Sequence, residues 1–330
     1  MSHIPVLLDE VVAALAPAQN EIYVDGTFGG GGYTRAFLEA ASCQVVALDR
    51  DLEAIARGQD LVDRYPGLKV LPGCFGDMAE LLSAQNIGPV AGVILDIGVS
   101  SFQIDQDERG FSFMRDGPLD MRMGQAGPSA ADIVNAMAET DLANIIFRLG
   151  EERQSRRIAR SIAERRIEQP IKTTLELANI VEEAVGGRRG KRTHPATLTF
   201  QALRMYVNDE LGELARGLAA AERILAPGGR LIVVTFHSLE DRLVKRFFRE
   251  RSGADAGGSR YRPERTAQAM PSFELINRKA IEPSEAECVA NPRARSARLR
   301  GGRRTMAAPW AGEVATGVTV PSLQTGAFAA

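Results

Sequence analysis

Short apolar runs that alternate with helical segments fill the first third of the chain. Each run has the length of a buried strand, and together they cover residues 21–25, 44–49, 68–71 and 90–97. Their side chains are apolar without regular polar alternation, so both faces of each strand are expected to be buried. The pattern predicts an α/β fold, in which helices cover both faces of a mostly parallel, doubly wound sheet.

The strand pattern stops after Ile97 and returns only at residues 231–236, after the turn Pro227-Gly228-Gly229. The segment between them shows helical periodicity without a convincing strand. We therefore expect a core domain in two parts, 1–105 and 211–304, and an inserted all-helical domain at 106–210 that recognises the substrate. Residues 273–278 and 297–300 are expected to close the sheet as an antiparallel edge pair, and residues 305–330 to form a flexible tail.

The net charge of -2 conceals two basic segments. Residues 148–204 hold 13 basic and 7 acidic side chains, and residues 242–304 hold 16 and 7. Such clusters are typical of proteins that bind a polyanion, although solvated helix faces would give the same counts. Three scattered cysteines predict neither a disulfide nor a zinc site. Without an apolar leader or a membrane-length apolar run, the chain is expected to be cytoplasmic, with no membrane partner.

Four consecutive glycines at residues 29–32 follow the first predicted strand. Ligands of open parallel sheets bind at the carboxyl ends of the strands, where glycines let the backbone approach a ligand closely. The glycine spacing does not fit the dinucleotide fingerprint, and the lysine of a phosphate-binding loop is absent. Asp49 ends the second strand, and its spacing from the glycines is that of an acid that binds ribose hydroxyls. Asp96 ends the fourth strand in the same way. A structural turn and a helix cap are the alternatives for the glycines and for Asp96.

Longer motifs surround these positions in a fixed order. They are VDGTFG at 24–29, DIGVSS at 96–101, ERGFSFMRDGPLDMRM at 108–123, HPAT at 194–197, FHSLEDR at 236–242 and NPRARS at 291–296. With these motifs, the chain closely resembles the ribosomal small-subunit methyltransferase H family, also called MraW, over residues 1–304.

The resemblance implies a Rossmann-like class I methyltransferase. Such an enzyme would transfer a methyl group from S-adenosyl-L-methionine to N4 of a cytidine in the decoding centre of 16S rRNA, within the small ribosomal subunit. The implied cofactor contacts are Gly31, Gly32, Tyr33, Asp49, Phe75, Asp96 and Gln103. Many relatives have histidine at the position of Tyr33 and proline at that of Phe102, which leaves the role of the Tyr33 side chain open. The oligomeric state, monomer or homodimer, is also open. No metal site is expected, because the sequence shows no cluster of ligands, although metal dependence is not decided.

Methyl transfer from a sulfonium depends mainly on holding the nucleophile in line with the methyl group. Asp96 is the candidate acceptor for the N–H groups of the amine. The (D/N/S)PP(Y/F/W) motif of many amino-methyltransferases is missing, since Ile97 and Gly98 follow Asp96. His237 and Ser238, after the strand at 231–236, are candidates to contact the base or accept a proton. A histidine with a structural hydrogen bond is the alternative.

Two groups of residues are candidate RNA contacts. Arg109, Phe111, Phe113 and Arg115 combine charge with aromatic faces that could stack on an extruded base, with a packed loop as the alternative. Arg188, Arg189, Lys191 and Arg192 form a run that contains no acidic residue, and this run predicts phosphate binding.

Three other functions remain open from the residues alone. A nicotinamide-dependent oxidoreductase would share the sheet and the ribose-binding acid, but the dinucleotide fingerprint is missing. A non-catalytic RNA-binding protein would explain the basic segments but not the acids at the strand ends. A methyltransferase that acts on a protein or a small-molecule amine is opposed only by the resemblance and the basic segments.

Overall fold

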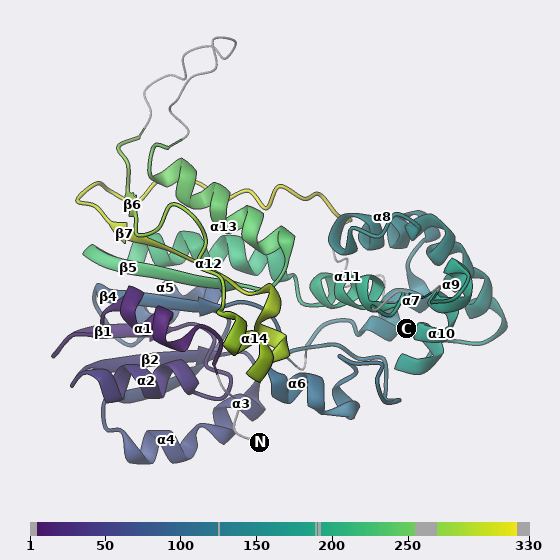
Figure 1. The fold of residues 1–330 in the computed structure, drawn as a ribbon, viewed down its shortest axis with the longest axis horizontal. Helices are drawn as coiled ribbons and strands as arrows, with labels where there is room; N and C mark the ends of the chain where they lie inside the picture. Colours follow the sequence, from purple (N-terminus) through teal and green to yellow (C-terminus); the bar gives the residue numbers. More distant parts are fainter. Residues whose placement is uncertain (1–4, 125, 189, 191–192, 255–268, 322–330) are drawn as a thin grey trace, which may run out of the picture. The chain divides into compact units, whose positions relative to one another are not determined.

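The structure is a computed structural model that describes residues 5–124, 126–188, 190, 193–254 and 269–321. The chain divides into two compact units (Figure 1). The core unit comprises Met1–Gly98 and Leu211–Thr316, and the inserted unit is built on Val99–Glu210. The first division therefore comes before α6 (Ser101–Asp105), which the sequence had placed in the core. Within the described residues, no helix is long and apolar enough to cross a membrane.

A single sheet lies at the centre of the core unit. Among the described residues it has seven strands, in the order β3-β2-β1-β4-β5-β7-β6. The strands from β3 to β5 are parallel, whereas β7 pairs antiparallel with both β5 and β6. The β6 and β7 strands correspond to the predicted antiparallel pair. The strand bounds are β1 Ile22–Asp25, β2 Gln44–Asp49, β3 Leu68–Pro72, β4 Val90–Asp96, β5 Leu225–Thr235, β6 Phe273–Leu275 and β7 Arg298–Arg304.

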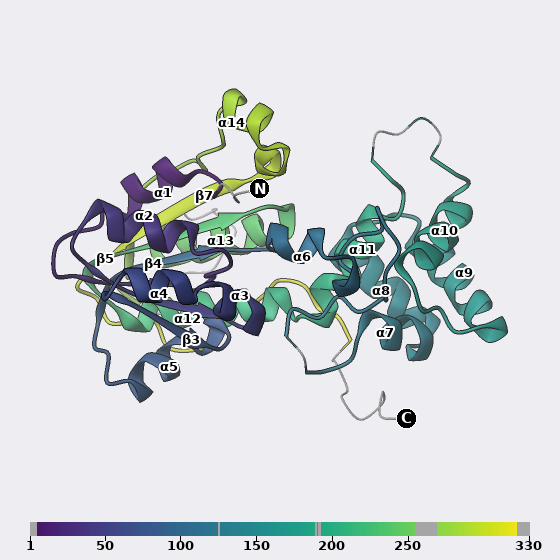
Figure 2. The ribbon, with the colours of Figure 1, turned by 90° about the horizontal axis from the view of Figure 1, so that it is seen from below.

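Helices cover both faces of this sheet (Figure 2). On one face, α1 (Leu8–Leu15) and α2 (Gly32–Ala40) pack over a buried apolar cluster that includes Tyr23, Phe37 and Ile232. On the other face lie α5 (Met78–Ala84) and α12 (Glu210–Ile224), while α13 (Ser238–Arg251) packs against β5, β6 and β7. The predicted α/β class with a doubly wound, mostly parallel sheet is confirmed. The chain order of the strands reverses at β1 and β4, and ligands of such sheets bind at this point.

The apolar periodicity of residues 52–65 predicts one helix, whereas the structure has two, α3 (Leu52–Arg57) and α4 (Gln59–Arg64). The division falls at Gly58, where an added Cβ would lie 2.3 Å from Cε1 of Phe28. Phe28 is buried in the core, so Gly58 provides the space for its ring. The periodicity on either side of Gly58 is that of a single helix. It gives no sign that the Phe28 ring, from a distant part of the chain, packs against Gly58.

The inserted unit is helical. After α6 it contains α7 (Ala130–Ala136), α8 (Glu139–Gly150), α9 (Ser155–Glu168), α10 (Thr174–Val185) and α11 (Thr197–Val207). An isolated bridge between Pro118 and Thr173 is its only β pairing within the described residues. Asn208, which is buried, joins the end of this unit to its beginning. Its Oδ1 accepts from the N–H of Met123 at 2.7 Å, and its Nδ2 donates to the carbonyl of Met121 at 2.7 Å.

The flexible tail expected from residue 305 does not begin there. The indole Nε1 of Trp310 donates to the carbonyl of Met270 at 2.9 Å, and the Trp310 ring lies 4.5 Å from the Arg251 guanidinium. Arg251 is itself buried and forms an ion pair with Glu222 at 3.0 Å. The segment is thus held because it covers a buried ion pair, which its small, aperiodic composition did not indicate. Residues 322–330 lie outside the described residues.

Candidate active site

The loop after β1 is tied to the ends of two neighbouring strands. The N–H of Gly29 donates to Oδ2 of Asp49 at the end of β2, with a distance of 2.8 Å. The hydroxyl of Thr27 accepts from the N–H of Asp96 at the end of β4, also at 2.8 Å. The strand ends that the sequence predicted to converge are therefore linked through this loop.

Asp25 lies beneath the loop and is fully buried. Its Oδ2 accepts from the hydroxyl of Thr34 at 2.7 Å, and its Oδ1 accepts from the N–H of Thr27 at 3.1 Å. Burial raises the pKa of Asp25 to about 6, against the lowering effect of these hydrogen bonds. Asp25 thus connects the loop to the first turn of α2.

Asp49 holds two backbone groups and keeps capacity for further donors. Besides Gly29, the N–H of Asp51 donates to Oδ1 of Asp49 at 2.8 Å. A carboxylate has about four lone-pair positions, so each oxygen can accept one more hydrogen bond. Burial raises the pKa of Asp49, whereas the two backbone donors favour its charged form. The position and this remaining capacity suit a pair of vicinal hydroxyls.

Gly31 and Gly32 are pressed against the protein itself. An added Cβ on Gly31 would lie 2.4 Å from Cδ1 of Leu61, and one on Gly32 would lie 2.2 Å from Cγ of Pro5. Gly31 also has a φ of 71°, in the left-handed region that favours glycine. The expected reason for these glycines was close approach to a ligand, but the structure shows that close packing within the chain already requires them.

Tyr33 and Phe75 have different surroundings. The Tyr33 ring is buried, and its hydroxyl donates to the carbonyl of Val6 in a short hydrogen bond. This contact gives the side chain a structural role that the sequence left open. Phe75 is half-buried at the start of a short 3₁₀ helix, Phe75–Asp77, and lies against Gly26 and against Gly217 of α12.

Asp96 has a buried acceptor atom that no described residue uses. Its Oδ1 has no hydrogen-bond partner among the described residues, although buried polar atoms are paired in the great majority of cases. Burial raises the pKa of Asp96 well above its ordinary value, and the nearby carboxylates of Asp25 and Glu240 raise it further. An acceptor left in this state at a strand end is suited to a ligand that donates a hydrogen bond.

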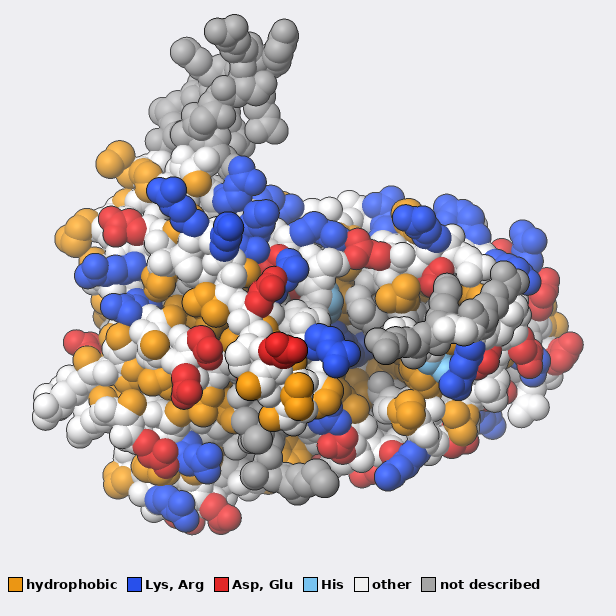
Figure 3. Space-filling view, viewed as in Figure 1, with side chains coloured by type: hydrophobic (Ala, Val, Ile, Leu, Met, Phe, Trp, Pro, Cys, Tyr) orange, Lys and Arg blue, Asp and Glu red, His pale blue; other side chains and the backbone are white. Residues whose placement is uncertain are grey.

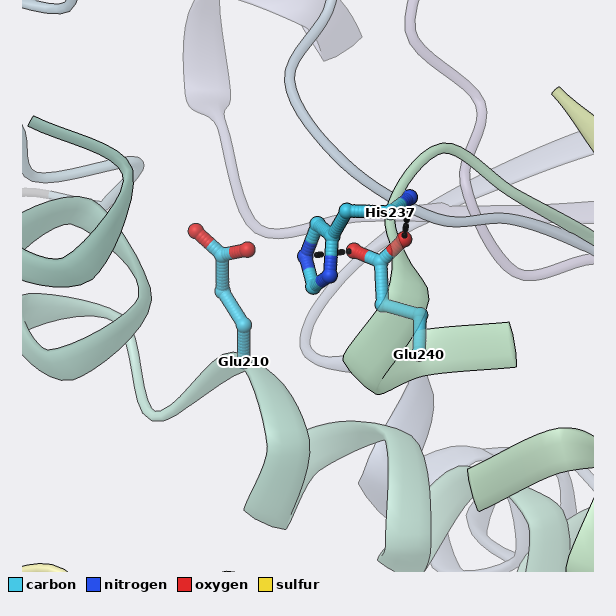
Figure 4. Close-up of side chains that lie close together, drawn as sticks. All are labelled: Glu210, His237 and Glu240. Atoms are coloured by element: carbon cyan, nitrogen blue, oxygen red, sulfur yellow. Dashed lines mark hydrogen bonds and ion pairs between the residues drawn. The ribbon is translucent and has the colours of Figure 1, made fainter. Parts of the chain in front are cut away.

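His237 follows β5, the neighbour of β4, and precedes α13. Its Nε2 lies 2.8 Å from Oε1 of Glu240, and Figure 4 shows the imidazole facing this carboxylate. The contact is close but not aligned as a hydrogen bond, and neither ring nitrogen has a directed partner within the described residues. Ser238 is the first residue of α13 and is exposed. The structure thus brings the His237 imidazole to the same edge of the sheet as Asp96.

Figure 4 also shows Glu210, the first residue of α12. Potential ligand atoms of Glu210, His237 and Glu240 lie within 4.8 Å of one another, a grouping that the sequence did not reveal. Both oxygens of Glu210 already accept from Arg204, at 2.7 and 2.9 Å. This pairing neutralises the Glu210 carboxylate, and we do not assign a metal to the group.

The predicted RNA contacts at residues 109–115 are largely engaged within the inserted unit. The guanidinium of Arg109 donates to the carbonyls of Arg122 and Met123, at 3.1 and 3.0 Å, and lies 5.9 Å from the Phe111 ring. Phe113 packs against His194 and Phe200, with ring centroids 4.7 Å apart in each case. Arg115 is exposed and lies 3.4 Å from Asp107. The packed-loop alternative therefore describes Arg109 and Phe113 in this structure.

The predicted phosphate-binding run is only partly described. Arg188 is exposed and its Nε lies 3.5 Å from Oε1 of Glu182, so this arginine has an acidic neighbour that the run itself lacks. Arg189, Lys191 and Arg192 lie outside the described residues. Gln103, a predicted cofactor contact, lies in α6 of the inserted unit, where its carboxamide and Ser100 form a capping box. Its contact with a cofactor stays a prediction.

Within the core unit, Lys and Arg side chains gather over α13 in the view of Figure 3. On α13, the exposed basic residues are Arg242, Lys245 and Arg249, at a spacing that places them along one side of the helix. On α9, Arg153 precedes the helix and Arg156, Arg157 and Arg160 are exposed along it. Both basic segments of the sequence thus contribute charge to the surface.

Comparison with known proteins decides the family. The sequence profile of the MraW methylase family matches residues 1–305. This chain belongs to the MraW methylase family. A relative from Hyphomonas neptunium, named ribosomal RNA small subunit methyltransferase H, is 63% identical over 97% of this chain and 94% of its own. A relative of the same name from Paramagnetospirillum magneticum is 58% identical over 93% and 97%. The resemblance found in the sequence is therefore confirmed, and the chain is a methyltransferase by family.

Solved structures overlap with this MraW methylase only loosely. An rRNA methylase from Streptococcus thermophilus is 11% identical, with a TM-score of 0.37 over 91% of this chain and 94% of the other. A putative methyltransferase from Streptococcus mutans in complex with SAH is 12% identical, with a TM-score of 0.38 over 92% and 99%. Scores this low support no argument about the site.

Three residues of this MraW methylase that the sequence did not single out organise the site. Asp25 and Thr27 connect the loop to α2 and to β4, and Glu240 contacts His237. Asp25 carried a usable signal, because it is an acid at a strand end like Asp49 and Asp96. Glu240 stands three residues after His237 at the start of a helix, a spacing that predicts a cap and gives no indication of a buried charge.

Proposed function

We propose that this protein transfers a methyl group from S-adenosyl-L-methionine to N4 of a cytidine in the decoding centre of 16S rRNA. The substrate would be the rRNA within the small ribosomal subunit, and the reaction would take place in the cytoplasm. Family membership supports methyl transfer, and the name shared by relatives 53–63% identical supports the small-subunit rRNA as substrate. The observation that carries the choice of an amine is the buried Oδ1 of Asp96, an acceptor without a donor among the described residues.

The ends of β1, β2 and β4 fit the proposed cofactor. Asp49 can accept from two ribose hydroxyls while it holds Gly29 and Asp51. The first turn of α2 directs the N–H groups of Gly32 and Tyr33 out of the helix, because N-terminal N–H groups have no intrahelical acceptor. Phe75 adds an apolar wall beside Gly26. When bound, S-adenosyl-L-methionine supplies an electrophilic methyl group on a positively charged sulfur.

Asp96 and His237 would receive the amine. The strands β4 and β5 are parallel neighbours, with Asp96 paired with Val234, so the two side chains follow adjacent strand ends. The exocyclic amine of cytosine has two N–H donors and a lone pair that is delocalised into the ring. A hydrogen bond from one N–H of the amine to Oδ1 of Asp96 would return electron density to the nitrogen. His237 would then take the proton that the nitrogen loses. Ser238, exposed at the start of α13, would contact the base.

The pKa of Asp96 predicts how the rate of methyl transfer should change with pH. Only the ionised carboxylate is a pure acceptor, and burial together with Asp25 and Glu240 raises the Asp96 pKa well above its ordinary value. The ionised fraction therefore increases as pH rises, and we expect the rate of methyl transfer to increase with it. The positive charge of the bound cofactor would favour ionisation of Asp96.

Substrate recognition is proposed for the inserted unit and the basic surface. The exposed arginines of α9 and the run at residues 188–192 would contact RNA phosphates, since clustered basic side chains bind polyanions through counterion release. Arg115 is exposed, and Phe111 is half-buried beside Arg109, so these residues would contact the nucleotides next to the target.

The test is transfer of labelled methyl from S-adenosyl-L-methionine to purified small ribosomal subunits that lack the modification, followed by nucleoside mass spectrometry. We expect N4-methylcytidine with the wild type. In Asp96→Asn, the rate should fall by roughly 10²-fold or more, by analogy with loss of one transition-state hydrogen bond. Thermal stability at neutral pH should not fall, because the substitution removes a buried carboxylate that lies near Asp25 and Glu240.

Asp60→Asn, at an exposed position on α4, removes the same charge away from the site and should transfer at the wild-type rate. Label in a protein or small molecule instead of RNA would overturn the choice of substrate. Wild-type protein that binds no S-adenosyl-L-methionine in calorimetry would overturn the proposed reaction as a whole.

A further inference from the structure

Glu240 is a fully buried carboxylate at the start of α13. Its Oε2 accepts from the N–H groups of Phe236 and His237, at 2.9 and 3.2 Å. Its Oε1 lies 2.8 Å from Nε2 of His237 (Figure 4). One oxygen therefore holds the backbone at the end of β5, while the other faces the imidazole.

The backbone contacts do not explain why this residue is charged. In a capping box, either glutamate or glutamine reaches back to the N–H groups at the start of the helix. The amide oxygen of glutamine accepts these hydrogen bonds as well as a carboxylate does. A buried carboxylate is costly unless it is paired, and Glu240 also repels the carboxylate of Asp96. A glutamine would cap α13 without either disadvantage. The negative charge must therefore serve the group that Oε1 faces, which is His237.

His237 has the properties of a ring held ready for a proton or a ligand. Its side chain is 12% exposed, and neither nitrogen has a directed hydrogen-bond partner within the described residues. The ring also faces the backbone N–H of Glu240 in the capping box of α13, so its position is set by the same residue that carries the carboxylate. At this distance the Glu240 carboxylate can attract a positive charge that forms on the ring during the reaction, because opposite charges attract strongly away from bulk water.

We propose that Glu240 is a positioning residue that orients the His237 imidazole and stabilises the imidazolium formed when His237 accepts the proton released by the substrate amine. This inference rests on the proposed function. In the transfer, the amine nitrogen forms a bond to the methyl carbon, and the sulfur keeps the electron pair of the broken carbon–sulfur bond. The nitrogen then releases one proton to the imidazole, whose new positive charge lies beside the Glu240 carboxylate. Asp96 accepts the other N–H of the amine and keeps its charge.

The decisive variant is Glu240→Gln in the full-length protein. Glutamine keeps the length of the side chain and an oxygen for the N–H groups of Phe236 and His237, so it separates the cap from the charge. We expect kcat for methyl transfer to small subunits to fall by roughly 10²-fold, the lower range for loss of acid–base assistance. The KM for subunits, the affinity for S-adenosyl-L-methionine and the unfolding temperature should stay at the wild-type values.

Glu176→Gln is the matched control. Glu176 is also near the start of a helix, α10, and its Oε2 accepts from the N–H of Lys172 at 2.9 Å, but it lies in the inserted unit. Its replacement should leave kcat unchanged. If Glu240→Gln also turns over at the wild-type rate, Glu240 is only a helix cap and the inference is wrong. If the wild type itself transfers no methyl group to the subunit, the proposed function fails before the inference is reached.

A second variant covers the case in which Glu240→Gln does not fold. His237→Ala keeps Glu240 and opens a space beside its carboxylate. Imidazole added to this variant should restore turnover in proportion to its concentration, because a free imidazole can bind next to Glu240 and accept the proton. A structural role for His237 predicts no rescue, and absence of rescue in a folded His237→Ala protein would overturn the inference.

Discussion

Asp25 is a buried acid at the end of β1, and Asp96, at the end of the neighbouring β4, has a buried Oδ1; the two differ in what their oxygens contact. Both oxygens of Asp25 accept hydrogen bonds, from Thr34 and Thr27, whereas Oδ1 of Asp96 accepts none from the described residues. A satisfied buried acid fixes a loop, and an unsatisfied one is available to a ligand. The two acids thus illustrate how neighbouring side chains of the same type divide structural and chemical roles.

The pKa of Asp25 gives a measurable dependence of stability on pH. Its pKa rises from 3.8 to about 6, so the folded state binds a proton more tightly than the unfolded state. This stabilising contribution is complete below about pH 4 and is lost as pH rises through 6. With about 1.4 kcal/mol for each pKa unit, the loss amounts to about 3 kcal/mol. Asp25→Asn removes the titration, so its free energy of unfolding should gain that amount relative to the wild type between pH 4 and pH 7.

Urea denaturation at the two pH values measures this difference, and Asp60→Asn serves as the comparison for loss of one exposed acid. A gap between Asp25→Asn and the wild type that is the same at pH 4 and pH 7 would show that Asp25 keeps its ordinary pKa. Comparison of each variant with the wild type at the same pH cancels the contribution of all other titrating groups.

The glycine loop and the helix that follows it behave as one element. Gly31 combines a left-handed backbone with tight contact to Leu61 and Phe28, and Thr34 in the first turn of α2 bonds to Asp25. The geometry of the loop is therefore imposed by packing on its inner side. The outer side, where Gly30 is exposed, is left for the proposed cofactor.

Gly31→Ala should disturb both the fold and the cofactor site. The left-handed backbone costs about 1–2 kcal/mol for alanine, and the added methyl group overpacks Leu61 at a cost of about 1–3 kcal/mol. We expect the free energy of unfolding to fall by about 2–5 kcal/mol, together with weaker binding of S-adenosyl-L-methionine in calorimetry. Gly88→Ala is the control, because an added Cβ there meets nothing within 4 Å. Equal stability of the two variants would contradict the packing argument.

Local patterns predicted most elements because each strand and helix carries its own periodicity. The bounds of β2 were correct, those of β4 were one residue too long, and the β6 and β7 pair was recognised from two short segments. Contacts between distant residues were not predictable in this way. Phe28 divides a helix at Gly58, and Trp310 covers Arg251, and neither event leaves a mark in the local sequence.

The same limit applies to the candidate site. Asp49, Asp96 and His237 were found because the ends of parallel strands meet at one edge of a sheet. Asp25 was not predicted to have a role, although it is also an acid at a strand end, and the buried charge of Glu240 is visible only in three dimensions. For the inserted unit, the sequence could not tell a base-stacking aromatic from a core aromatic, and Phe113 packs with His194 and Phe200.

The distribution of charge over the protein separates two kinds of surface. The two basic segments lie in the inserted unit and at the C-terminal side of the core unit, and the rest of the chain is acidic, since the net charge is -2. A basic surface attracts RNA, and an acidic remainder limits binding elsewhere on the molecule. The run at 188–192 holds four of the positive charges of the first basic segment.

Replacement of Arg188, Arg189, Lys191 and Arg192 by glutamine should lower the salt dependence of RNA binding. Each lost phosphate contact reduces the slope of log affinity against log salt by about 0.7–0.9. The expected result is weaker binding to small subunits at low salt with unchanged affinity for S-adenosyl-L-methionine. The double variant Arg35→Gln and Arg64→Gln, at exposed positions on α2 and α4, is the control and should leave the slope unchanged. An unchanged slope in the fourfold variant would remove this run from the RNA-binding surface.

The hydrogen bonds of Asn208 bear on the order in which the protein folds. The strand β4 pairs with β5, but the ribosome must synthesise the whole insertion before β5 exists. Until then, β4 has one unpaired edge, and the entropy lost on joining β4 to β5 grows with the length of flexible chain between them. Asn208 joins the end of the insertion to Met121 and Met123 near its start. If the insertion folds first, the flexible chain between β4 and β5 is therefore much shorter than the full insertion. The nascent core can then close rapidly when its last parallel strand emerges.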